Sequence, residues 1–327
     1  MAEVRHFLRD DDLSPAEQAE VLALAAEMKA DPYGAKPLAG PQSVAMIFDK
    51  PTLRTQTSFG AGIAELGGNP MLVEGKLAGI GVRESVEDVA RVLGRQVSVV
   101  VWRTFLQSHL ERMAENAGIP VVNALTDDFH PCQLIADLLT VQERLGRLAG
   151  VTVAFIGDAA CNMGNSWLLA GATAGMHVRM GGPEGYLPED AMFARAAEIA
   201  ATTGGSVSGH HDPVEAVTGA DVVVTDTWVS MGKEDEAAAR AAIFAPWSLT
   251  EDLLAHADDA AIVLHCLPAY RDKEIATSVL EGPRSAVWEE AENRRHAQKA
   301  VLAWLLAHRT DTTPSPAQAA AAVPVEA

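Results

Sequence analysis

The chain has 327 residues, about twice the usual single-domain length, which favours two domains over one large α/β domain. Hydrophobic residues make up 48% of it and aromatic residues 5%, a composition that excludes a disordered or fibrous protein. Lys and Arg number 25 against 44 Asp and Glu, so the net charge is −19. This charge disfavours nonspecific binding to nucleic acid or to an anionic membrane, and an anionic ligand would need a local cluster of positive charge.

The cysteines and the N-terminal residues bear on the cellular compartment in which the protein is expected to work. Cys132, Cys161 and Cys266 share no metal-ligand spacing, and an odd, scattered set is a poor disulfide framework. Residues 1–18 have neither the apolar core of a signal peptide nor the acid-poor composition of a transit peptide. The longest apolar runs are also too short to span a membrane. We therefore expect a cytoplasmic protein with no metal site.

The first half alternates strand and helix patterns. Ser14-Pro15 is typical of a helix start. Apolar runs predict buried strands at 43–48, 97–102 and 120–124 and a further strand at 71–73. Helical patterns run through Phe59, Ile63 and Leu66, from Ser85, and over about 133–145. Residues 75–81 read as a Gly-rich loop. Strands alternating with helices predict a parallel sheet with right-handed crossovers.

The second half repeats this alternation. Residues 146–150 form a plausible boundary, strands are predicted at 151–157, 221–225 and 261–265, and helices at 163–174 and 291–307. The fold class expected is α/β, with two doubly wound parallel-sheet domains of similar size. Residues 309–327 are rich in Pro and Ala, which predicts a disordered tail.

Ligands of open α/β sheets bind at the carboxyl ends of strands, where this sequence places unusual side chains. Thr52, Arg54 and Thr55 lie between a strand and a helix start, where hydroxyls, a guanidinium and free helix amides suit a phosphate group. An N-cap threonine beside a surface arginine is the alternative. Arg103 and His130 follow two other strands of the same predicted sheet. His130 could donate a hydrogen bond to a carbonyl oxygen or act as a local cap.

Strand ends of the second half carry a different chemistry. Asp226 follows a Val-rich strand and suits an ammonium group, and His265 with Cys266 follows another. The turn at 157–164 lacks G-x-G-x-x-G and places Asp158 where a pyrophosphate would lie, which disfavours a dinucleotide. Asn162 in that turn is a candidate polar contact.

These segments together resemble the aspartate/ornithine carbamoyltransferase family, and its ornithine-specific members in particular, from Arg5 to about Leu306. The matching motifs are Arg54-Thr55, Trp102-Arg103-Thr104, His130-Pro131-Cys132-Gln133, Asp226 with Ser230-Met231-Gly232, His265-Cys266-Leu267-Pro268, and Ala291-Glu292-Asn293-Arg294. The resemblance implies carbamoyl transfer from carbamoyl phosphate to the side-chain amine of L-ornithine, which gives L-citrulline and phosphate in arginine metabolism.

The resemblance also implies an organisation. A carbamoyl phosphate domain would cover 1–146 and an ornithine domain 147–290, and a helix at about 291–308 would return to the first domain. The implied assembly is a homotrimer, or a multiple of trimers, with active sites between subunits. Neither a metal ion nor an organic cofactor is implied.

The family's residue roles transfer position by position. Thr52, Arg54, Thr55 and Arg103 would hold the phosphate, while Arg103, His130 and Thr55 would surround the carbamoyl oxygen. Gln133 and the Cys266-Leu267 backbone would contact the carbamoyl nitrogen. The amino-acid portion of ornithine would be held by Asn162, Asp226, Ser230 and Met231, with Cys266 near the attacking amine and Arg294 completing the pocket.

Three positions depart from the family pattern. Leu53 and Gln56 stand where relatives commonly carry a threonine and an arginine, and Gly79 stands where many carry a glutamine that reaches a neighbouring subunit. Lys76 or Arg83 could replace that glutamine. These departures leave two alternatives: a carbamoyltransferase for another amine, such as N-acetylornithine or putrescine, or a catalytically weak relative that binds metabolites. Arg54, Arg103, His130 and Gln133 are retained, which favours activity, and Asp226 favours ornithine over aspartate because it would repel a second carboxylate.

Overall fold

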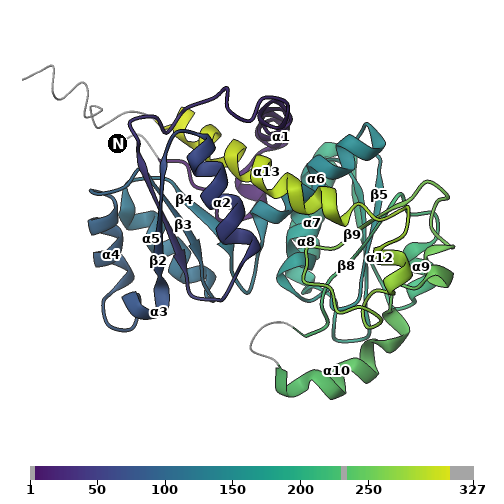
Figure 1. Cartoon of the computed structure of the whole chain (residues 1–327). Helices are drawn as coiled ribbons and strands as arrows, with labels where there is room; N and C mark the ends of the chain where they lie inside the picture. The colour runs from purple at the N-terminus through teal and green to yellow at the C-terminus, as the bar shows by residue number, and fades with distance from the viewer. Residues whose placement is uncertain (1–3, 230–233, 310–327) are drawn as a thin grey trace, which may run out of the picture.

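The computed structural model describes residues 4–229 and 234–309, which form two α/β halves, each built on one parallel sheet (Figure 1). The first sheet has the order β2-β1-β3-β4, from β1 (Ser43–Phe48), β2 (Asn69–Glu74), β3 (Val99–Arg103) and β4 (Val121–Leu125). The second has the order β7-β6-β5-β8-β9, from β5 (Thr152–Ile156), β6 (His177–Gly181), β7 (Ser206–His210), β8 (Val222–Thr225) and β9 (Ile262–Leu264). The predicted pair of parallel-sheet α/β domains is confirmed.

Helices cover both sheets. Those of the first half are α1 (Pro15–Ala30), α2 (Arg54–Glu65), α3 (Gly75–Ala78), α4 (Val86–Leu93), α5 (Gln107–Ala117) and α6 (Pro131–Leu145). Those of the second half are α7 (Asn162–Thr173), α8 (Asp190–Thr203), α9 (Pro213–Val217), α10 (Ala237–Phe244), α11 (Glu251–Leu254) and α12 (Thr277–Leu280). No helix among the described residues is long and apolar enough to cross a lipid bilayer.

The sheet order brings the polar strand ends together. In the first sheet the chain leaves β1 toward β2 and later returns to place β3 on the other side of β1, so β1 and β3 flank a crevice at their carboxyl ends. The Asp49 amide donates to the Arg103 carbonyl oxygen at 2.9 Å and ties these two ends. The second sheet has the equivalent crevice between β5 and β8, where the Thr225 hydroxyl donates to the Ile156 carbonyl oxygen at 3.0 Å.

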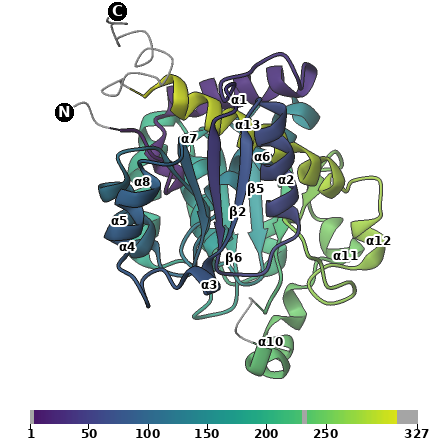
Figure 2. The same ribbon diagram turned by 60° about the vertical axis from the view of Figure 1, so that its left-hand side comes forward.

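The last described helix, α13 (Val287–Ala307), joins the halves. It packs on α6, α1 and α2, and Figures 1 and 2 show it crossing from the second half onto the first. Its Lys299 ammonium is buried and pairs with Glu65 at 2.8 Å, which matters because a buried charge without a partner is strongly destabilising. The helix that was expected to return to the first domain therefore does so.

Several local predictions differ from the structure. Strands β6 and β7 have no counterpart among the predicted strands, because their exposed and half-buried positions break the apolar run that marks a buried strand. Helix α13 begins at Val287 rather than near 291, and the predicted Gly-rich loop contains the short helix α3. Gly79 ends α3 with φ of +66°, a left-handed conformation that favours glycine.

Candidate active site

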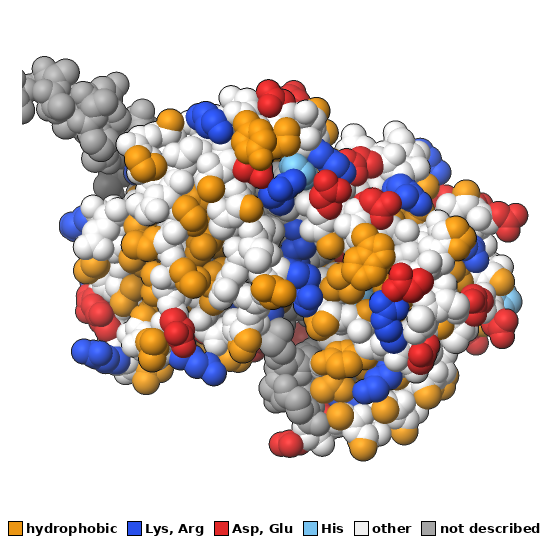
Figure 3. All heavy atoms as spheres, in the orientation of Figure 1, with side chains coloured by type: hydrophobic (Ala, Val, Ile, Leu, Met, Phe, Trp, Pro, Cys, Tyr) orange, Lys and Arg blue, Asp and Glu red, His pale blue; other side chains and the backbone are white. Residues whose placement is uncertain are grey.

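The carboxyl ends of both sheets face one cavity of about 620 Å³. Its lining joins the two halves: Lys50, Thr52, Arg54, Thr55, Arg103 and His130 come from the first, Asp158, Asn162, Asp226, Cys266 and Leu267 from the second, and Arg294 from α13. Lys and Arg side chains gather along the junction of the halves (Figure 3). The positive cluster that an anionic ligand would need is therefore present despite the overall negative charge.

The start of α2 forms one wall. The Thr52 hydroxyl accepts the Thr55 amide at 3.3 Å, so the expected threonine cap exists, but Arg54 is half-buried and lines the cavity instead of lying free on the surface. The Thr55 hydroxyl oxygen accepts hydrogen bonds from Arg294 at 2.9 Å and from Arg103 at 3.4 Å. Because both of its lone pairs are engaged, its own hydrogen remains available for a ligand.

Arg103 and Arg294 supply buried positive charge. They are 6% and 3% exposed, and the Nε atom of each has no hydrogen-bond partner among the described residues. Burial, together with the neighbouring guanidinium of Arg294, lowers the pKa of Arg103 to about 10; burial lowers that of Arg294 as well. Both remain cations near neutral pH, and an anion would relieve their mutual repulsion.

His130 stands at the N-terminal end of α6 with its side chain turned into the cavity. Its side chain makes no capping hydrogen bond, and its Nδ1 has no partner in the described part of the chain. The backbone amide is held instead by the Ser166 hydroxyl at 2.9 Å. Burial, then the charges of Arg294, Arg103 and Lys50, push the His130 pKa well below its ordinary value. The ring is therefore neutral near pH 7 and able to donate one hydrogen bond.

Gln133 lies behind this wall. It is 1% exposed and does not line the cavity. Its side-chain amide oxygen accepts a hydrogen bond from Arg294. The predicted contact between Gln133 and a carbamoyl nitrogen stays a prediction.

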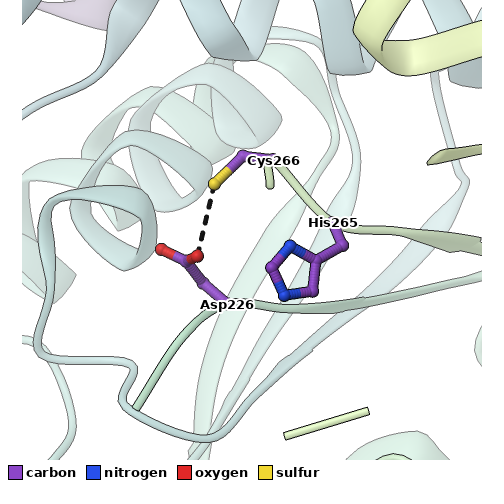
Figure 4. A group of neighbouring side chains, drawn as sticks. All are labelled: Asp226, His265 and Cys266. Carbon is purple, nitrogen blue, oxygen red and sulfur yellow. Dashed lines mark hydrogen bonds between the residues drawn. The ribbon is translucent and has the colours of Figure 1, made fainter. Parts of the chain in front are cut away.

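The second half supplies an acidic wall. The Cys266 thiol donates to Asp226 at 3.3 Å (Figure 4). The Thr227 amide donates to the same carboxylate oxygen at 2.7 Å. Burial raises the pKa of Asp226 above its ordinary value. An ammonium group bound here would gain an ionic partner and favour the ionised form of the acid.

Asp226, His265 and Cys266 are also close enough to be considered as metal ligands. The His265 Nδ1 accepts the Leu267 amide at 2.9 Å, however, and its Nε2 lies 3.3 Å from the buried Glu274 carboxylate. Both ring nitrogens are thus engaged within the protein. This arrangement fits a histidine that shapes the loop after β9 better than a metal ligand.

Asn162 lines the cavity at the start of α7 and donates to the Thr126 carbonyl oxygen at 2.7 Å, which links the halves. Leu267 also lines it, with φ of 58°, an uncommon value for leucine that turns the chain after β9.

Ser230 and Met231, which were predicted to contact ornithine, lie outside the described residues. Lys76 and Arg83 are exposed and do not belong to the described cavity lining.

Sequence reasoning missed two cationic residues of the cavity. Lys50 is 7% exposed and pairs with Asp127, and Arg240 is 5% exposed and pairs with Asp158. Lys50 lies two residues after the predicted strand at 43–48, a position that could have identified it. Arg240 reaches the cavity from α10 and has no such sequence signal.

A cavity with a cationic wall and an acidic wall, set between two parallel α/β sheets, suits an enzyme that brings an anionic and a cationic substrate together. The comparisons agree with this class. The carbamoyl phosphate-binding domain of aspartate/ornithine carbamoyltransferase matches residues 5–143, and the Asp/Orn-binding domain matches 149–305.

Named relatives cover nearly the whole chain. Ornithine carbamoyltransferase of Clavibacter michiganensis subsp. michiganensis is 61% identical over 302 residues, which is 92% of this chain and 98% of the relative. The structure of ornithine carbamoyltransferase from Pyrococcus furiosus superposes with a TM-score of 0.89 at 39% identity, covering 94% of this chain and 98% of that one. An N-acetyl-L-ornithine transcarbamylase superposes at 0.82 with 31% identity, covering 92% and 100%. The chain belongs to the aspartate/ornithine carbamoyltransferase family.

Proposed function

We propose that the protein transfers the carbamoyl group of carbamoyl phosphate to the side-chain amine of L-ornithine, which yields L-citrulline and phosphate. The observation that carries this proposal is the single cavity in which Arg54, Arg103 and Arg294 face Asp226. The cationic wall suits a phosphorylated acyl donor, and the half-buried acid suits the ammonium group of an amino acid. The curated relatives with 52% to 61% identity carry the same activity in their names.

The reaction forms one C–N bond and breaks one C–O bond. The amine lone pair attacks the carbamoyl carbon, and negative charge develops on the carbonyl oxygen, toward which Arg103, His130 and the Thr55 hydroxyl would direct hydrogen bonds. Fixed donors of this kind stabilise the transition state more than the ground state. The phosphate then leaves with the C–O electron pair and accepts the proton that the amine loses. In this proposal no metal ion or organic cofactor takes part.

The attacking amine has to be neutral. A free amine of the lysine type has a pKa of about 10.4, so at neutral pH the site has to favour the deprotonated form. The guanidinium groups near the transferred carbon would disfavour a second cation there, and a dry cavity adds to the effect. Asp226 would at the same time hold the α-ammonium group, which stays charged.

Roles within the chain follow from the same proposal. Residues 1–146 with the returning helix would bind carbamoyl phosphate, and residues 147–290 would bind ornithine through Asn162, Asp226, Ser230 and Met231. Assembly into trimers and a cytoplasmic location belong to the proposal too, as does a place in arginine metabolism.

A panel of amines tests the substrate. Purified protein with carbamoyl phosphate is given ornithine, N-acetylornithine, putrescine or aspartate, and ureido product is measured. We expect ornithine to give the highest kcat/KM. Preference for N-acetylornithine or putrescine would replace the acceptor but keep the transfer chemistry, whereas the absence of product with every amine would favour a metabolite-binding relative.

A further inference from the structure

Behind the cationic wall, α6 and α13 meet at a polar cluster that carries two carboxyl groups. Asp137, Glu290 and Gln133 are each at most 1% exposed. The side-chain amide nitrogen of Gln133 donates to Asp137 at 2.8 Å and to Glu290 at 3.0 Å. The other Glu290 oxygen accepts the His265 backbone amide at 2.8 Å, so the cluster also reaches the end of β9.

This arrangement fixes the orientation of the Gln133 amide. Only its NH₂ end can face two carboxyl acceptors, so its oxygen has to point the other way. That oxygen accepts a hydrogen bond from Arg294, whose second terminal nitrogen donates to the Thr55 hydroxyl at 2.9 Å. A continuous chain of hydrogen bonds therefore runs from the two carboxyls to the cavity wall.

Two carboxylates on one amide would repel each other if both were ionised. Burial and their mutual charge raise the pKa of both groups, to about 7 for Asp137 and well above its ordinary value for Glu290. Three other titratable groups face the pair. The guanidinium of Arg294 favours ionisation of both carboxyls, and the charge of Asp226 opposes ionisation of Asp137. The third group is the Cys266 thiol. Two carboxyls that face one NH₂ group and both have a raised pKa therefore favour a state in which a single proton is held between Asp137 and Glu290.

We propose that Asp137 and Glu290 are positioning residues that share one proton and, through Gln133, hold Arg294 in the cationic wall of the active site. The pair supplies one negative charge close to a guanidinium that lies near Arg103 and Arg54. Without that negative charge and the hydrogen bond through Gln133, the repulsion among the three guanidinium groups would displace the Arg294 side chain from its position in the cavity wall. The inference deepens the proposed function and rests on it.

Kinetics of two Asp137 variants test the proposal. Asp137→Leu removes one acceptor of the Gln133 amide and frees it to rotate, so the KM for carbamoyl phosphate should rise about tenfold while the KM for ornithine changes little. Asp137→Asn keeps the acceptor oxygen and offers an NH₂ group to Glu290 in place of the shared proton. It should bring the KM for carbamoyl phosphate back close to the wild-type value.

Thr140→Val is the matched control. Thr140 lies on α6 one turn beyond Asp137 and accepts a hydrogen bond from Asn293 of α13 at 2.9 Å, so this variant loosens the same helix pair without touching Gln133. It should lower Tm and leave both KM values unchanged. If Asp137→Leu and Thr140→Val alter the KM for carbamoyl phosphate equally, the positioning role is wrong.

Infrared spectroscopy tests the proton without any turnover, even if Asp137→Leu fails to fold. At pH 8 the wild-type protein should show a protonated-carboxyl band that Asp137→Asn lacks, because Glu290 then ionises against the new NH₂ group. Identical spectra in this region would overturn the shared proton. A wild-type protein that makes no citrulline would refute the proposed function instead, and the infrared result would still stand.

Discussion

The two walls of the cavity are prepared for their ligands in different ways. In the cationic wall, the Nε atoms of the buried Arg103 and Arg294 and the Nδ1 of His130 have no hydrogen-bond partner within residues 4–229 and 234–309. In the acidic wall, Asp226 already accepts hydrogen bonds from the Thr227 amide and the Cys266 thiol. The buried arginines and His130 of the cationic wall therefore offer hydrogen-bonding capacity to a ligand, whereas Oδ1 of the acid in the other wall already accepts two hydrogen bonds from within the protein.

This difference has an energetic meaning. Buried polar groups without partners cost about 1–3 kcal/mol each, and a bound anion that satisfies them recovers this cost. A ligand of the acidic wall meets a carboxylate with one oxygen already engaged, and gains mainly from its charge. We therefore expect the cationic wall to dominate both the affinity for the donor substrate and the stabilisation of the transition state.

Loss of His130 should have the largest effect. His130→Ala removes a donor to the developing oxyanion, and kcat should fall about 10²- to 10³-fold with little change in Tm. Steady-state kinetics and thermal denaturation check this. A wild-type kcat would remove His130 from the mechanism and leave its unbonded nitrogen unexplained.

The same residue gives a pH dependence with a defined sign. The His130 pKa is lowered in the folded state, so the unfolded state takes up the proton first as pH falls through its ordinary value of about 6.5. The contribution of His130 to stability is present above that pH and is lost below it. The free energy of unfolding should thus decrease less between pH 7 and pH 5 in His130→Ala than in the wild type, as measured by denaturant titration.

Asp226→Asn tests the acidic wall. The amide keeps the shape and the acceptor oxygen but loses the charge, so kcat/KM for ornithine should fall about 10- to 100-fold, in line with about 1.5–3 kcal/mol for a hydrogen bond to a charged group. Binding of carbamoyl phosphate, measured by calorimetry, should not change. The reverse pattern would exchange the assignments of the two walls.

Arg54→Met should act more weakly on the cationic wall. Arg54 is half-buried, and Arg103 and Arg294 remain when it is removed, so the KM for carbamoyl phosphate should rise about tenfold with a smaller change in kcat. Arg91→Met is the control, because Arg91 is an exposed arginine that pairs with Asp88. An unchanged KM in Arg54→Met would show that the buried pair alone holds the phosphate.

The sequence alone predicted the parts of the site that follow strands. Arg103 and Asp226 come directly after a predicted strand, Arg54 lies in the segment between another strand and the next helix, and the sheet order places all three at one cavity. The place of Arg294 in the site was predicted only from the family resemblance, because the sequence around a residue in the middle of a helix does not indicate which wall of a cavity its side chain reaches.

The Asp137–Glu290 pair was not foreseen at all. Its members are 153 residues apart, as the difference of their numbers shows, and they meet only because α13 packs on α6. A single buried Asp in an apolar helix pattern carries no sign of its partner. Strands β6 and β7 were missed for a related reason, because their burial comes from one face only and leaves no continuous apolar run.

The smallest effect is expected at Leu53, where relatives commonly carry a threonine. Leu53 is 73% exposed and does not line the cavity, and the hydroxyl of the neighbouring Thr52 already accepts the Thr55 amide. Leu53→Thr should therefore change the KM for carbamoyl phosphate by less than about threefold and stability by about 0.5 kcal/mol or less. A tenfold lower KM in steady-state assays would mean that the cationic wall of a single chain is incomplete and that its contrast with the acidic wall is smaller than the buried arginines indicate.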